Sequence, residues 1–330
     1  MDRWRKYRRW WMLAVLLALC GCAHHVKVSP ESIRTVYAVE NKTEDPLPLF
    51  APLFLVNGYK DPYNRIGRPA AVIDKKGREH VYVDTDRPAI YAAVRTFRTD
   101  KGEYTNYIYR VHFPEVPFSL IPFNLTAGNN VGLMMVVTAD PENRPLLITT
   151  VHTCGCYRAT VPTSDLPAHA LPEDWQEGPL DVFGEKLPSR LDYAEMESPR
   201  ILVHLRPGVH RVMDLEVVER GDFDDGSAFH LIDTPLVPMD ELERIPANGD
   251  TTSFYHDKGW LKGHVKGSVK WWESMFLSLL SLDLFVGTDK VYADSKITGN
   301  PFYTSLKPWN RDASDMWDFA GFLEFWGWRL

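Results

Sequence analysis

The sequence Pro145-Leu-Leu-Ile-Thr-Thr-Val151, followed by His152-Thr-Cys-Gly-Cys-Tyr-Arg158, carries both a strong strand signal and the main candidate site. The first part is apolar and β-branched, which favours a β-strand. Side chains two residues apart share one face of a strand. If the strand runs unbroken, His152, Cys154 and Cys156 therefore project side by side.

One interpretation of this alternation is a metal site. One imidazole and two thiolates on one face suit a soft or borderline ion such as Zn(II) or Cu(I). The local motif supplies three ligands, so a fourth must come from elsewhere in the chain. The candidates for it are His112, His169, His204 and His210.

A second interpretation is a disulfide between Cys154 and Cys156. Their Cα separation along a strand, roughly 6.5–7 Å, sits at the upper edge of what a disulfide tolerates. Such a bridge would be strained and easily reduced, although Gly155 lets the backbone bend to close it. A redox-active thiol pair is one form of this interpretation. The third interpretation is two small buried residues on a core strand.

Composition places the chain among ordinary globular proteins. Its 330 residues are 45% hydrophobic and 25% charged, with a formal net charge of -7. Residues 1–21 hold five basic residues and one acid, so the rest carries 32 basic against 43 acidic residues, a charge of -11. Such a chain presents no basic face, and we therefore expect no nucleic-acid partner.

The N-terminus has the pattern of a secretory signal. Residues 1–11 are rich in Lys and Arg, residues 12–19 are apolar but too short to span a bilayer, and Leu19-Cys-Gly-Cys22 follows. With Leu19 three positions before Cys22 and Gly21 directly before it, this ending resembles the lipobox of bacterial lipoproteins. The resemblance covers residues 1–22 only.

The resemblance implies that residues 1–21 are a signal peptide and that Cys22 becomes a lipidated N-terminus. An acyl chain would then hold the protein at a membrane surface. Ala23 stands where an Asp would indicate retention at the inner membrane, so the expected location is the outer membrane, facing the periplasm. Residues 22–46 are polar and are interpreted as a tether.

The region 47–250 is expected to be an antiparallel β domain, a sandwich or a barrel-like sheet, because apolar runs alternate with short turns. Four hairpins are predicted, each with a turn that contains Gly or Asp-Pro. Their strands are 70–73 with 79–83, 90–98 with 105–113, 132–138 with 146–153, and 200–205 with 209–218.

The region 251–330 is expected to form a mostly helical subdomain packed on the β domain, which makes the fold class mainly β (α+β). Glu273 and Asp283 interrupt the apolar segment 269–286, so it is a poor membrane span. Its serines lie on one narrow side at helical spacing. The helix is expected to pack on the β core, and the alternative is an interfacial helix at the membrane.

The chain contains no G-x-S-x-G, H-E-x-x-H, Walker or dinucleotide motif, and no local pattern pairs its carboxylates. The sequence therefore predicts a membrane-anchored envelope lipoprotein that binds an unknown protein or ligand or has a structural role. The alternative is a soft-metal (Zn or Cu) binding or thiol-redox protein that uses His152, Cys154 and Cys156, with His112, His204 or His210 as fourth metal ligand.

Overall fold

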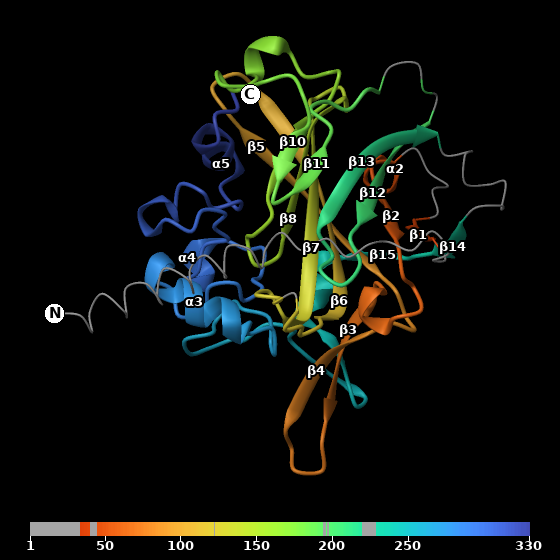
Figure 1. Ribbon diagram of the computed structural model, residues 1–330, viewed down its shortest axis with the longest axis vertical. Coiled ribbons are helices and arrows are strands. Elements are labelled where there is room, and N and C mark those ends of the chain that lie inside the picture. Colours follow the sequence, from red (N-terminus) through yellow and green to blue (C-terminus); the bar gives the residue numbers. More distant parts are fainter. Residues whose placement is uncertain (1–33, 40–44, 122, 194–195, 197, 220–228) are drawn as a thin grey trace.

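The computed structural model describes residues 34–39, 45–121, 123–193, 196, 198–219 and 229–330. Within them the chain is mainly β, with several sheets and no closed barrel, which confirms the predicted class. A central sheet lies between a second sheet on one side and the C-terminal segments with α3, α4 and α5 on the other (Figure 1). The predicted signal peptide and Cys22 lie outside the described residues.

The central sheet has six strands in the order β15-β5-β6-β7-β8-β9. Its neighbours are antiparallel except for β15 and β5, which run parallel. The strands are β5 (Ile90–Arg98), β6 (Glu103–Val116), β7 (Gly128–Ala139), β8 (Pro145–His152), β9 (Ala159–Pro162) and β15 (Leu236–Pro238).

The second sheet has five strands in the order β13-β12-β2-β1-β14. Segments far apart in sequence meet here through two parallel pairs, β12 with β2 and β1 with β14. The strands are β1 (Thr35–Ala38), β2 (Leu53–Val56), β12 (Pro199–Leu205), β13 (Val212–Glu219) and β14 (His230–Asp233).

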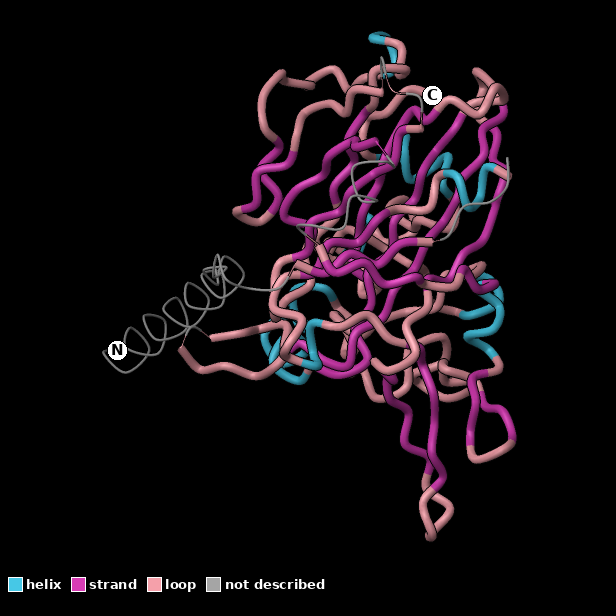
Figure 2. The backbone as a smooth tube through the Cα atoms, turned by 90° about the vertical axis from the view of Figure 1, so that its right-hand side faces the viewer, coloured by secondary structure: helices cyan, strands magenta, loops and turns pink. Residues whose placement is uncertain are grey.

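The remaining strands form a four-stranded sheet, β17-β16-β3-β4, and a small hairpin, β10-β11. The hairpin of β3 and β4 extends away from the body (Figures 1 and 2). These strands are β3 (Arg68–Ile73), β4 (Glu79–Asp84), β10 (Leu180–Val182), β11 (Glu185–Leu187), β16 (Ile245–Ala247) and β17 (Asp250–Thr252). The helices are α2 (Pro46–Leu49), α3 (Trp271–Ser281), α4 (Ser295–Thr298) and α5 (Phe319–Phe325).

All four predicted hairpins are present, as β3–β4, β5–β6, β7–β8 and β12–β13. Each joins strands through a turn of few residues, so local sequence is enough to specify it. The division into a β domain of residues 47–250 and a subdomain of residues 251–330 stays a prediction.

Both faces of the central sheet are buried, so every residue of β8 and every residue of β7 after Asn129 is buried. Met135 and Val137 of β7 face the second sheet in a core that includes Phe54 of β2. Met134 and Val136 face the opposite way, into a core shared with the C-terminal region. The sheet is thus the middle of three layers.

The C-terminal helix α5 packs on this outer core, as expected. Phe319 and Phe322 are buried, and the Phe319 ring lies 5.3 Å from that of Phe97 on β5. The Asp318 side chain accepts from Gly321 N and caps the helix. None of the helices in the described part of the chain is both long and apolar enough to cross a bilayer.

Candidate functional site

The Cys-Gly-Cys sequence lies in a turn, not in a strand. Strand β8 ends at His152, and β9 begins at Ala159. Gly155 N donates to His152 O at 2.7 Å, and His152 N donates to Cys156 O at 2.9 Å. Gly155 takes a φ of +95°, which an extended strand does not allow. The expectation that the strand runs unbroken through Cys156 is therefore wrong, and the shared face of His152, Cys154 and Cys156 is not formed.

His152 is a buried residue of the hydrophobic interior. Its Nε2 lies 3.2 Å from His210 O, and its ring meets the Tyr157 ring edge-on at 4.9 Å. Burial, and then the positive charge of Lys270, lower the pKa of His152 well below its usual value. The imidazole is therefore neutral, and its ring nitrogen is used by a backbone carbonyl.

The other candidate histidines lie in separate surroundings. His112 is fully buried between aromatic rings. His204 Nε2 lies 2.6 Å from Glu216 Oε1, and His210 stacks on Phe113 at 4.1 Å. Across the described residues, no group of three or more His, Cys, Asp and Glu side chains is placed to hold a metal ion. The structure therefore does not assemble the predicted Zn or Cu centre.

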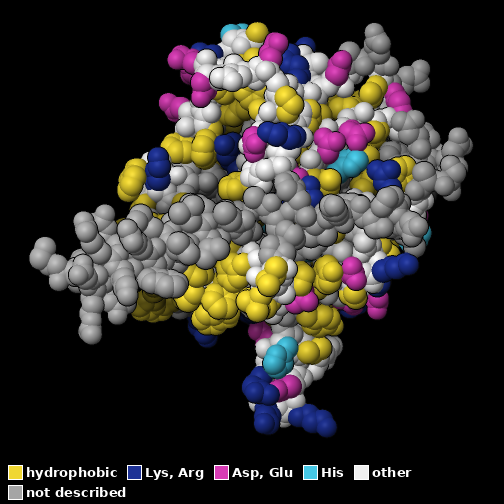
Figure 3. All heavy atoms as spheres, in the orientation of Figure 1, with side chains coloured by type: hydrophobic (Ala, Val, Ile, Leu, Met, Phe, Trp, Pro, Cys, Tyr) yellow, Lys and Arg dark blue, Asp and Glu magenta, His cyan; other side chains and the backbone are white. Residues whose placement is uncertain are grey.

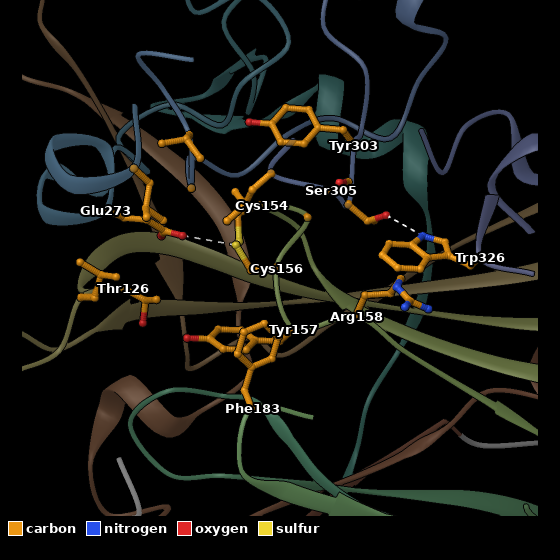
Figure 4. A pocket seen from close by; sticks show the side chains of 17 residues that line it. Thr126, Cys154, Cys156, Tyr157, Arg158, Phe183, Glu273, Tyr303, Ser305 and Trp326 are labelled. Atoms are coloured by element: carbon orange, nitrogen blue, oxygen red, sulfur yellow. Dashed lines mark hydrogen bonds between the residues drawn. The ribbon is translucent and has the colours of Figure 1, made fainter. Parts of the chain in front are cut away.

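Cys154 and Cys156 are both free thiols, so the alternative disulfide is not formed here. The two thiols line the same cavity, and Cys156 Sγ lies 3.3 Å from Glu273 Oε1 (Figure 4). The hydrogen bond from Cys156 lowers the pKa of Cys154, although burial opposes it. The same hydrogen bond, together with burial, raises the pKa of Cys156 well above its usual value. Cys154 is thus the thiol that ionises first.

A buried cation lies next to this pair. Lys270 is 1% exposed, and its Nζ lies 3.2 Å from Asp289 Oδ2. Burial works against the charged ammonium, but Asp289 and then Cys154 attract it and hold the pKa of Lys270 well above normal. Lys270 is therefore charged, and its field favours a thiolate at Cys154.

The turn is held in place by the segment 288–290. Asp289 Oδ1 accepts from Gly132 N at 3.1 Å and from Thr153 Oγ1. Lys290 Nζ, which is fully buried, donates to Cys154 O at 3.2 Å, and Lys290 N donates to Thr153 O at 2.8 Å. The backbone on both sides of Cys154 is therefore fixed by polar contacts.

Gly155 is needed for a second reason besides its φ. A Cβ built on Gly155 would overlap the carbonyl oxygen of Tyr303, well inside 3.0 Å. The turn thus packs directly on the backbone of residues 303–304, and a side chain at position 155 would force the two segments apart.

Both cysteines line a cavity of about 210 Å³. Its walls are largely apolar, from Leu125, Leu277, Val286 and Leu306, with the rings of Tyr157, Phe183, Tyr303 and Trp326. Figure 4 shows side chains from several elements converging on Cys156. The volume is below the range of drug-sized pockets, about 300–1,000 Å³, so the cavity suits a small molecule or one side chain.

Two aromatic contacts shape the cavity. Arg158 stacks on Trp326 with its guanidinium carbon 3.7 Å from the ring centre, and burial lowers its pKa to about 10. Phe183, in the turn between β10 and β11, is 51% exposed and meets the Tyr157 ring at 4.8 Å. The aromatic wall therefore includes one residue that is open to solvent.

Among the described residues that line this cavity, Glu273 is the one acidic side chain. It comes from the first turn of α3, is 3% exposed, and its Oε2 has no hydrogen-bond partner within the described part of the chain. A Cβ on Gly287 would overlap this carboxylate, so the carboxylate is closely packed. One oxygen thus contacts the Cys156 thiol while the other is buried and unpaired.

Comparison with known proteins gives no relative for this arrangement. No protein-family model matches the chain, and neither a curated protein nor a solved structure matches it significantly.

The sequence did not identify Lys270, Glu273 or Asp289 as neighbours of the cysteines. Their positions are more than 100 residues beyond Cys156, and no spacing rule connects them. The one sequence feature that indicates Glu273 is its position within the apolar segment 269–286, where it also argues against a membrane span. A carboxylate at such a position is either exposed or functional, and the fold makes it buried.

Proposed function

We propose that this protein is a lipid-anchored envelope protein that performs thiol–disulfide exchange with a small disulfide, using Cys154 and Cys156. The observation that carries the proposal is the pair of free thiols in the wall of one cavity, with a buried carboxylate in contact with Cys156 and a buried cation nearby. A reactive cysteine is activated by such a cation.

The proposed roles follow from the contacts. The Cys154 thiolate attacks one sulfur of the substrate disulfide, forms a mixed disulfide and releases the first substrate thiolate. Cys156 gives its proton to Glu273, and its thiolate attacks Cys154 Sγ and releases the second thiolate. The dithiol is oxidised to a disulfide by two electrons, and the substrate disulfide is reduced to two thiols, which take up the two protons.

The spacing supports a bridge that forms and breaks readily. Only Gly155 separates the two cysteines, so the resulting ring is small and strained. Strained disulfides have less negative reduction potentials than structural ones. The Cys154–Cys156 disulfide would therefore readily oxidise the thiols of a second molecule.

The proposed location agrees with this chemistry. The lipobox-like ending at Cys22 supports a location outside the cytoplasm, where disulfides persist. The net charge of -7 supports a small-molecule or protein disulfide as partner over nucleic acid.

The experiment is to trap the first intermediate. The protein is the chain from residue 22 with Cys22→Ser, so that Cys154 and Cys156 are its only cysteines. With glutathione disulfide at neutral pH, its Cys156→Ala variant should accumulate a glutathione adduct on Cys154, detected by intact mass spectrometry. The parent with both cysteines should instead lose two hydrogen atoms and carry no adduct. In the matched Cys154→Ala variant, Cys156 should react more slowly, because the Glu273 carboxylate raises the pKa of Cys156 whereas the Lys270 charge lowers that of Cys154. Equal reactivity of the two single-cysteine variants would contradict the proposed roles.

A second candidate function is a non-enzymatic binding module for a small apolar ligand. The apolar walls around the cysteines favour it. The double variant Cys154→Ser/Cys156→Ser separates the two functions. A binding module should keep its affinity for a small apolar probe that quenches Trp326, whereas exchange activity must be lost.

A further inference from the structure

Helix α3 is oriented with its polar side inward. Glu273, Ser274 and Ser281 are buried, and Ser274 Oγ donates to Val286 O at 3.2 Å. The opposite side shows Met275 at 57% and Leu279 at 77% exposure. A surface helix of a globular protein normally buries its apolar stripe and exposes its polar one. The sequence pattern of one narrow polar side was therefore correct, but that side faces the interior.

The exposed apolar surface continues beyond the helix into the loop that follows β6. Phe118 stacks on Trp272 with ring centres 6.0 Å apart, which joins the loop to α3. Figure 3 shows hydrophobic side chains gathered in this region. We call this surface the α3 face. Its members are Phe118, Leu120, Ile121, Trp271, Trp272, Met275, Leu279, Leu280, Leu282 and Leu284, all between 37% and 94% exposed.

We infer that the α3 face lies in the interface of a lipid bilayer, with α3 parallel to the membrane surface. An apolar patch of this extent on a protein marks an interaction surface. Its tryptophans, 76% exposed at Trp271 and 37% at Trp272, belong to the residue type that favours the headgroup level of a bilayer.

The length of the chain before the described residues favours a lipid bilayer as the partner of the α3 face. Eleven residues, 23–33, separate the proposed acylated Cys22 from Arg34, where the described chain begins. They reach at most about 40 Å, since an extended chain spans roughly 3.3–3.6 Å per residue. The body is thus held within about one domain diameter of the bilayer, so the α3 face meets lipid at a high effective concentration.

Charge indicates how the face would bind. The chain from residue 22 carries 32 basic against 43 acidic residues, so attraction to anionic lipid cannot be the main force. Insertion of apolar side chains must supply it, and binding should then be insensitive to salt and to lipid charge.

This inference goes beyond the proposed exchange chemistry, but the two share one helix. Glu273 and Leu277 of α3 line the cavity of the cysteines, while Met275 and Leu279 form the outer face. A docked α3 face therefore places the dithiol cavity directly behind the membrane surface. Its substrate would be a disulfide that is itself at the membrane.

The test is flotation with phosphatidylcholine vesicles. The protein is the chain from residue 22 with Cys22→Ser, so that no acyl chain contributes. It should float with the vesicles, equally at low salt and at about 0.5 M salt, where the Debye length is only a few Å. The double variant Leu279→Glu/Leu284→Glu should reduce the bound fraction about ten-fold or more, because two exposed leucines no longer insert.

The matched control is Val72→Glu/Ile73→Glu on the protruding β3–β4 hairpin, whose side chains are 42% and 44% exposed. It should float like the parent chain, and circular dichroism should show all variants folded. Cys154→Ser should also float, which separates this inference from the exchange chemistry. The inference is overturned if the parent chain does not float, or if both double variants lose the same share of the vesicle-bound fraction. It is also overturned if the chain does not bind vesicles but forms a dimer that Leu279→Glu dissociates.

Discussion

Replacing Gly155 by alanine is expected to destabilise the protein much more than the same replacement in an open turn. Gly155 combines a φ of +95° with a close approach to the Tyr303 carbonyl oxygen. Gly77, in the turn between β3 and β4, has a φ of +74° but nothing within 4 Å of its added Cβ. Comparing Gly155→Ala with Gly77→Ala therefore separates the cost of a positive φ from the cost of the steric overlap.

The magnitude follows from two contributions. A non-glycine residue at positive φ costs roughly 1–2 kcal/mol, and both variants lose this amount. Forcing a methyl group against fixed backbone adds about 1–3 kcal/mol, and only Gly155→Ala loses it. The expected decrease in unfolding free energy is thus about 2–5 kcal/mol for Gly155→Ala and about 1–2 kcal/mol for Gly77→Ala.

Urea denaturation followed by tryptophan fluorescence measures both variants against the parent chain. The comparison is valid if the three unfolding transitions have similar slopes. Equal losses for Gly155→Ala and Gly77→Ala would refute the reasoning, because the turn would then not be packed on residues 303–304.

Three further predictions concern the charges and protons of the interior. Lys270→Met should lower the unfolding free energy by about 3–5 kcal/mol in urea denaturation, because it leaves Asp289 buried without its cation. His210, whose pKa is lowered by burial to about 3, stabilises the fold fully above pH ~6.5, and this contribution is lost as the pH falls toward 3. His210→Asn should therefore reduce the fall of unfolding free energy between pH ~6 and ~4 by about 1.4 kcal/mol per pH unit. Cys156→Ala should raise the pKa of Cys154, seen in the pH dependence of its alkylation rate, because it removes the hydrogen bond that lowers it most; an unchanged profile would contradict that contact.

The sequence predicted the parts of the fold that depend on neighbouring residues. The four hairpins follow from turn residues placed between apolar runs, as at Lys75-Lys-Gly77. It did not predict the parallel pairs of β12 with β2 and of β1 with β14. Those pairs join segments with no local signal of their meeting, and they lie in the second sheet, which packs on one face of the central sheet.

The predicted site residues lie in a turn and not along one face of a strand. Gly155 was expected to let a strand bend, whereas its positive φ lies in a turn after the end of β8, and the Cys156 sulfur lies against Glu273. The sequence pattern also did not determine which way the narrow polar side of α3 faces. The polar side faces inward because its residues have polar partners there, such as the Cys156 thiol for Glu273 and the Val286 carbonyl for Ser274. These partners are distant in sequence, so only the folded structure identifies them.

The most direct test of the dithiol is a redox titration, in glutathione buffers, of the chain from residue 22 with Cys22→Ser, which keeps only Cys154 and Cys156. Each state is trapped by alkylation and weighed. The protein should convert reversibly between a form with two alkylated cysteines and a form with none, with a midpoint less negative than about -300 mV. A chain that keeps both thiols alkylatable at the most oxidising ratio, or that gains only glutathione adducts, would contradict the assignment of Cys154 and Cys156 as an exchanging pair.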